Sequence, residues 1–97
     1  MKHIAILVGA ALLALASAAF AADIPQGAAA CSGCHPAKAG VDTPVPRLMG
    51  RDAAQIVAAM ADFRAGKRPA TIMDRVAKGF TDDEVKAIAA WFAAQKD

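Results

Sequence analysis

The stretch Cys31-Ser32-Gly33-Cys34-His35 decides how the rest of this 97-residue chain can fold. Two thiols three positions apart on one helical turn point the same way, so both can add across the vinyl groups of one porphyrin. The histidine that follows then lies beneath the iron and offers an imidazole nitrogen as an axial ligand. The motif therefore predicts one covalent haem c, held by Cys31 and Cys34 through thioether bonds and by His35 at the iron.

A C-x-x-C pair can also be a redox dithiol or half of a zinc site. Zinc needs further ligands, and the other histidine is His3, in a segment that we expect to be removed. A thioredoxin-like pair needs a βαβ setting, and nothing in this sequence indicates a strand. Both alternatives are therefore disfavoured against haem attachment.

The first 21 residues have the features of an export signal. A short basic start, an apolar run over residues 4–15 and the small-residue pattern Ala19-Phe20-Ala21 predict cleavage after Ala21. We expect residues 1–21 to be a signal peptide and residues 22–97 to be one monohaem domain in the periplasm. An uncleaved membrane anchor is the alternative, because the apolar stretch is long enough for one.

The part of the chain after the leader is nearly neutral. Without Lys2, ten Lys and Arg residues stand against nine Asp and Glu. This balance argues against nucleic acid or an anionic membrane surface as a partner. A domain this small has a marginal core, and a covalent haem would supply a large apolar plate around which short helices can collapse.

The residue pattern predicts about four short helices and no strand, an all-α fold around the haem. The first is expected over residues 25–34 with the haem motif in its last turn, the second over 52–65, and a short third over 71–79. Glycines and prolines exclude a regular element over residues 36–51. The small residues Gly27 and Ala28 would let another helix approach the first one closely, and for Gly27 the alternative is a residue that simply starts the helix.

The last helix has the clearest signals. Thr81 and Glu84 form a capping box at its start. Its apolar residues recur at helical spacing and predict a buried stripe, flanked by Trp91. The stripe consists of Val85, Ile88, Ala89 and Phe92.

Pro46 is a candidate for a supporting role at the iron. A haem-ligating histidine usually donates its other ring N–H to a carbonyl, which fixes its tautomer. A proline carbonyl in a rigid loop is a suitable acceptor, so Pro46 is expected to hold His35. A plain turn is the alternative for this segment.

A methionine thioether is the usual partner of histidine in electron-transfer haems. Met60 falls on the apolar face of the second helix and is interpreted as core. Met49 lies in the proline-rich loop and could reach the iron only if that loop crossed the distal face. Met73 lies in a short segment that can be held against that face, and it is favoured over Met49.

The order of these features resembles the class I cytochromes c. Pro46-Arg47-Leu48 looks like the proline-x-leucine segment by which that family supports its haem histidine. Residues 63–73 (FRAGKRPATIM), 77–82 (AKGFTD) and 91–95 (WFAAQ) are similar to the cytochrome subunit of flavocytochrome c sulfide dehydrogenase and to related small periplasmic cytochromes. The resemblance covers nearly all of the mature chain, and it implies that Met73 ligates the iron.

The resemblance implies an electron-transfer protein rather than an enzyme. A flavoprotein subunit would perform the sulfide chemistry and pass electrons singly to this haem. One alternative is a freely diffusing cytochrome that donates electrons to an oxidase or another respiratory enzyme. Another is a ligand-binding or peroxidatic haem with an open sixth site. Redox proteins are the expected partners, with no nucleic acid and no membrane insertion after signal cleavage.

Overall fold

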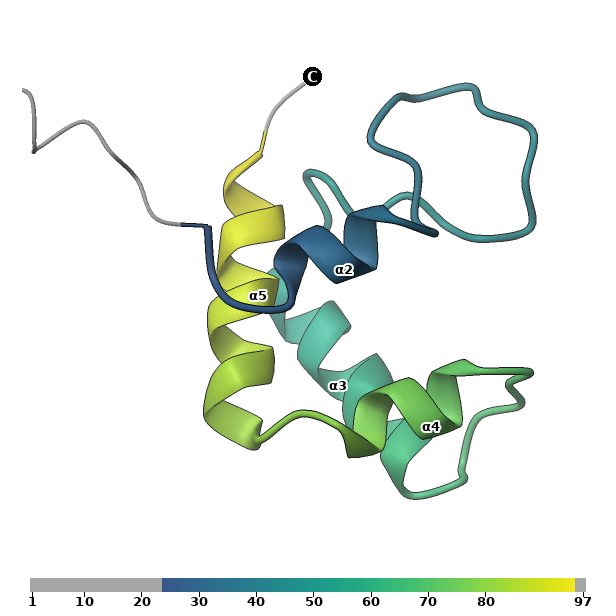
Figure 1. The fold of residues 1–97 in the computed structure, drawn as a ribbon, viewed down its shortest axis with the longest axis vertical. Coiled ribbons are helices and arrows are strands. Elements are labelled where there is room, and N and C mark those ends of the chain that lie inside the picture. The colour runs from purple at the N-terminus through teal and green to yellow at the C-terminus, as the bar shows by residue number, and fades with distance from the viewer. Residues whose placement is uncertain (1–23, 96–97) are drawn as a thin grey trace, which may run out of the picture.

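The computed structural model describes residues 24–95, so the expected signal peptide and its cleavage site lie outside the described residues. Over this range the chain forms helices and no strand, which confirms the expected all-α class. The helices, labelled as in Figure 1, are α2 (Ala28–Ser32), α3 (Ala53–Arg64), α4 (Met73–Lys78) and α5 (Asp82–Ala94). None of them has the length and apolar character needed to cross a bilayer.

The longest helix of the described chain is α5, which runs along one side of the fold (Figure 1). α2 packs against α5, and α3 packs against both α5 and α4. α2 and α4 do not contact each other. The two short helices are therefore held by a common scaffold of α3 and α5.

The core of the described domain is small. Its buried apolar side chains are Ala28, Ile56, Ala77, Val85, Ile88, Ala89 and Phe92, and three of these seven are alanine. Four of them are the stripe expected on the last helix, which is confirmed. So few large buried side chains give little hydrophobic stabilisation, and a domain of this kind needs an additional apolar group or cross-link.

α3 begins and ends where local sequence signals place it. Asp52 caps α3 by accepting a 2.7 Å hydrogen bond from the Ala54 N–H. α3 ends in a Schellman motif, in which left-handed Gly66 (φ 72°) lets the Lys67 N–H reach the Asp62 carbonyl at 2.9 Å. The expected span of 52–65 is thus confirmed to within one residue at each end.

The capping box of α5 is also present. The Glu84 N–H donates to Thr81 Oγ1 at 3.2 Å, and the Thr81 N–H donates to Glu84 Oε1 at 2.9 Å. At the other end, Trp91 meets Phe92 edge-to-face with ring centroids 5.0 Å apart. The expected start of the last helix is confirmed.

The first helix is shorter than expected, and this corrects the span of 25–34. α2 begins only at Ala28, because Gly27 has a left-handed backbone (φ 94°) that interrupts a helix started at Pro25. α2 ends at Ser32, so Cys34 and His35 follow the helix instead of completing its last turn. The small residues serve as expected, since Ala28 is fully buried and Gly27 lies against Phe80 and Ile88.

Residues 36–51 form a loop without regular structure, as expected. The Arg47 Nε donates to the Ala37 carbonyl at 2.7 Å and closes the loop across its base. The Gly50 N–H donates to the Phe92 carbonyl at 2.9 Å, and Met49 packs against the core. The end of this loop is therefore fixed to α5.

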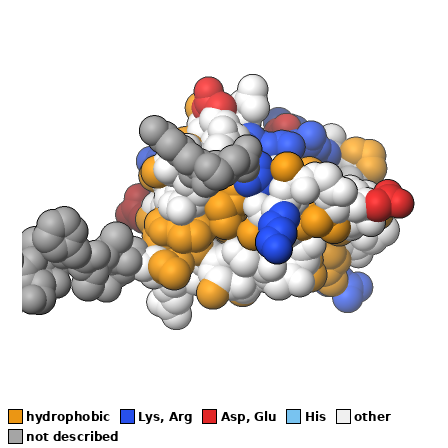
Figure 2. Space-filling model, turned by 90° about the horizontal axis from the view of Figure 1, so that it is seen from above, with side chains coloured by type: hydrophobic (Ala, Val, Ile, Leu, Met, Phe, Trp, Pro, Cys, Tyr) orange, Lys and Arg blue, Asp and Glu red, His pale blue; other side chains and the backbone are white. Residues whose placement is uncertain are grey.

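The surface mixes charge and apolar groups. On the face shown in Figure 2, side chains of both charge signs alternate with apolar ones that reach the surface. Ile24, Val41 and Ile72 are the large apolar residues that remain more than half exposed in the described chain. On this face no extended patch of positive side chains is present that would select a polyanion.

Candidate haem site

The backbone keeps Cys31 and Cys34 in one continued turn although α2 has ended. The Cys34 N–H donates to the Cys31 carbonyl at 3.2 Å, and the His35 N–H donates to the same carbonyl at 2.9 Å. These bonds continue the turn for three residues, so residues 31 and 34 keep the spacing of helical neighbours. Cys31 is half-buried against the core and Cys34 is exposed.

The surroundings of Cys31 do not favour a redox dithiol. Burial raises the pKa of the Cys31 thiol above its ordinary value, against the smaller opposing effect of a backbone hydrogen bond. A reactive dithiol needs the opposite, a lowered pKa that makes the thiolate available at neutral pH. Within residues 24–95 no three His, Cys, Asp or Glu side chains are grouped to hold a metal ion.

The His35 ring is oriented by the loop that follows it. Its Nδ1 lies 2.5 Å from the Pro46 carbonyl oxygen. A carbonyl can only accept a hydrogen bond, so Nδ1 is the donor, and in the neutral ring Nε2 keeps its lone pair. The contact expected from the sequence is present, and it leaves the other ring nitrogen in the form that binds a metal.

The structure places the three methionines differently. Met49 and Met60 pack against the hydrophobic core. Met73 is the first residue of α4 and is half-buried. It stands one helical turn before Ala77, which is fully buried, so the two share the inward face of α4.

These placements fit a plate-like apolar group with two axial ligands. The thiols and the imidazole come from the end of α2, and the Met73 thioether comes from α4, which does not contact α2. Two large apolar residues, Val41 in the loop after His35 and Ile72 directly before Met73, are 51% and 54% exposed. The chain thus offers soft and nitrogen ligands together with apolar surface, the donor set that haem iron takes.

Two other features of the described chain lie apart from the motif. A shallow cleft of about 270 Å³ lies between α3 and α5, lined by Val57, Met60, Val85 and neighbours, and none of the motif residues borders it. Asp74 Oδ1, next to Met73, is a buried side-chain oxygen without a hydrogen-bond partner. A buried oxygen without a partner lowers the free energy of unfolding, so Asp74 destabilises the start of α4.

No family model matches the chain. It is 37% identical over 62 residues to the cytochrome subunit of sulfide dehydrogenase of Chlorobaculum tepidum, covering 64% of this chain and 56% of that protein. It is 39% identical over 77 residues to a thiosulfate dehydrogenase electron acceptor of Thiomonas intermedia, covering 75% of this chain and 36% of that protein.

A third relative matches end to end. Cytochrome c-553 of Helicobacter pylori is 30% identical over 100 residues, which cover 99% of this chain and all of that protein. The chain therefore spans about half or less of the length of the first two relatives but the full length of the third.

Proposed function

The chain belongs to the class I c-type cytochromes, and we propose that it is the electron-accepting cytochrome subunit of a sulfide-oxidising flavoprotein complex in the periplasm. As a member of this family it is an electron-transfer protein with covalently bound haem c. The similarity to a sulfide dehydrogenase subunit carries the more specific part of the proposal.

The haem, when bound, supplies one-electron chemistry at an iron that alternates between ferric and ferrous states. Cys31 and Cys34 would anchor it through thioethers, and His35 Nε2 and the Met73 sulfur would be its axial ligands. The hydrogen bond from His35 Nδ1 to Pro46 would keep the imidazole in the ligating tautomer. With both axial positions filled by the protein, no substrate would need to reach the metal.

The choice of Met73 is supported by the packing of its two competitors. Met49 and Met60 both contribute to the core, and moving either sulfur to the iron would open a gap there. Met73 shares the inward face of a short helix that contacts α3 and not α2. Met73 would therefore be able to bind a haem iron without unpacking the core.

Absorption spectroscopy of three ferric proteins tests the ligand set. Wild type should show the sulfur-to-iron charge-transfer band, Met73→Ala should lack it, and Met49→Ala should retain it. Retention in Met73→Ala with loss in Met49→Ala would transfer the role to Met49. Wild-type protein that lacks the band and binds carbon monoxide readily when reduced would instead identify a haem with an open sixth site.

The role as a fixed subunit has its own experiment. Tagged protein is purified from the periplasm of the native host at low ionic strength, and the copurified proteins are identified by mass spectrometry and flavin fluorescence. A flavoprotein at equal stoichiometry that reduces the haem with sulfide supports the proposal. A monomer that is not reduced by sulfide in the periplasmic extract contradicts it.

A free electron carrier is the second candidate. The observation that favours it is the end-to-end match to cytochrome c-553, whereas the sulfide dehydrogenase subunit is covered over only 56% of its length. In that case the monomer should donate electrons to a terminal oxidase in membranes from the same host. The same purification therefore separates the two candidates.

A further inference from the structure

We propose that Arg64 is a positioning residue for the sixth iron ligand, acting by fixing the carbonyl of Phe80 and with it the end of α4. This inference rests on the proposed role of Met73. The link is indirect, because Arg64 belongs to α3 and Met73 begins α4. The observations that connect the two residues are the hydrogen bonds of Arg64, the position of Phe80 and the packing of α4 against α3 alone.

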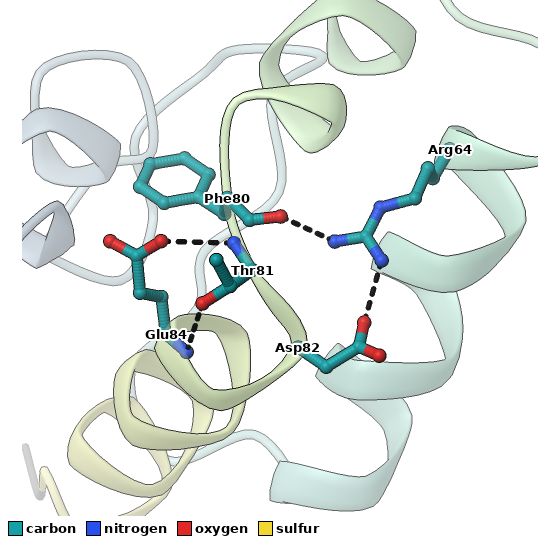
Figure 3. A network of polar contacts seen from close by, with 5 residues as sticks. All are labelled: Arg64, Phe80, Thr81, Asp82 and Glu84. Carbon is teal, nitrogen blue, oxygen red and sulfur yellow. Dashed lines mark hydrogen bonds and ion pairs between the residues drawn. The ribbon is translucent and has the colours of Figure 1, made fainter.

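Arg64 ends α3 and reaches one acceptor in the turn between α4 and α5 and one on the first residue of α5 (Figure 3). Its Nη2 donates to the Phe80 carbonyl at 2.6 Å, and its Nη1 donates to Asp82 Oδ1 at 2.6 Å. The Asp82 side chain is 80% exposed, so that ion pair contributes little stability. The bond to the Phe80 carbonyl is partly buried and charge-assisted, and it is the stronger attachment.

Phe80 is held from its other side by α2. A Cβ atom on Gly27 would lie 2.5 Å from Phe80 Cε1 and 3.0 Å from Cζ, so the ring rests directly on the α2 backbone. The carbonyl of Phe80 is fixed to α3 and its ring to α2. This residue therefore joins the start of the haem-bearing helix to the chain that leaves α4.

α4 packs against α3 and not against α2 or α5. It has six residues, too few to be stable as an isolated helix. Its first turn has no side-chain cap at Ile72, and residues 65–72 before it are exposed. Its end is closed by hydrogen bonds from Gly79 to Val76 and from Phe80 to Ala77, directly next to the carbonyl that Arg64 holds.

Movement of α4 would also move Met73. Ala77 is fully buried and shares a face with Met73, so any shift of α4 at its C-terminal end displaces the methionine on the same face. Loss of the Arg64 bond should leave the helical fold largely intact and make the sulfur easier to release. Local release of a ligand before global unfolding is the measurable difference between positioning and general stabilisation.

The test follows two signals in the ferric holoprotein through a denaturant titration at pH 7. The sulfur-to-iron band reports the Met73 ligand, and far-UV circular dichroism reports the helices. In Arg64→Ala the band should disappear at a lower denaturant concentration than the helices, and the equilibrium constant for sulfur release should rise about tenfold. In wild type the two transitions should lie closer together.

Three matched variants test whether the effect of Arg64→Ala comes from the lost bond to the Phe80 carbonyl. Asp82→Asn removes the charge of the exposed ion pair but keeps an oxygen acceptor, and Lys86→Ala removes a neighbouring exposed cation, so both should behave as wild type. Arg64→Lys keeps the charge but cannot reach both acceptors in the fork geometry, and it should be intermediate. If Arg64→Ala does not fold, Arg64→Lys carries the test.

The results that overturn the inference are distinct from those that overturn the ligand assignment. Parallel shifts of both transitions in the Arg64 variants would make Arg64 a general stabiliser. A gap in Asp82→Asn as large as that in Arg64→Ala would remove the role of the Phe80 carbonyl. A band that persists in Met73→Ala would refute the proposed ligand, whatever the Arg64 variants do.

Discussion

The Cβ position of Gly27 lies 2.5 Å from Cε1 of Phe80, so α2 and the turn before α5 approach more closely than any side chain at residue 27 would permit. Gly27 also has a φ of 94°, a conformation that other residues rarely adopt. Steric space and backbone conformation thus require glycine at the same position. This contact sets where the haem-bearing helix begins.

Gly27→Ala should therefore destabilise the protein for two reasons. Left-handed backbone costs a non-glycine residue roughly 1–2 kcal/mol, and the clash with Phe80 adds roughly 1–3 kcal/mol. Gly40→Ala is the matched control, because Gly40 has a φ of 79° and nothing within 4 Å of its Cβ position. Guanidinium unfolding should show a larger loss for Gly27→Ala, and equal losses would mean that the contact with Phe80 is unimportant.

The capping box of α5 gives a second prediction. Thr81→Ala removes the acceptor for the Glu84 N–H and should lower the free energy of unfolding by about 1 kcal/mol. Thr81→Ser keeps a hydroxyl at the same position and should stay close to wild type. Chemical denaturation of the three proteins measures the difference. A loss of the same size in Thr81→Ser would show that the methyl group, and not the cap, is responsible.

Met60 should behave as a core residue. Met60→Ala should lower the free energy of unfolding by roughly 1–2 kcal/mol, less than for a fully buried methionine because the side chain is half-buried. Met60→Leu conserves volume and should cost less. The sulfur-to-iron band should persist in both variants, and its loss in either one would place Met60 at the iron.

Removal of the covalent haem should affect the whole fold. The described core has seven buried side chains, and three are alanine, so the polypeptide alone buries little apolar surface. Cys31→Ala/Cys34→Ala protein should have weaker far-UV circular dichroism and a shallower denaturant transition than wild type. Cys34→Ala alone keeps one possible thioether and should lie between them. If the denaturant transition of the double variant matched wild type in slope and midpoint, the core would be stable without haem.

Much of this structure was predictable because its causes are local. The capping box of Thr81 with Glu84 and the stripe that ends at Phe92 specify α5 within one stretch of chain. The Asp52 cap and the Gly66 turn delimit α3 in the same way. The hydrogen bond from His35 to Pro46 spans only eleven residues, with prolines restricting the loop between them. The motif itself predicts haem from the reactivity of its side chains.

Other features depend on residues that are far apart in the sequence. The span predicted for the first helix was wrong because a proline and several alanines favour helix locally, whereas the close approach of Phe80 is accompanied by a left-handed Gly27. The partners of Arg64 lie 16 and 18 residues away, and no local pattern specifies which carbonyl a terminal arginine will reach.

The sequence by itself determined the cofactor, the helical class, both ends of α3 and the start of α5, because reactivity, hydrogen-bond caps and apolar periodicity act over a few residues. Only the tertiary structure decided how α2 meets the turn before α5, and that Met49 belongs to the core while Met73 faces inward from α4. Those outcomes depend on which surfaces meet when the helices pack, and packing is a property of the assembled chain.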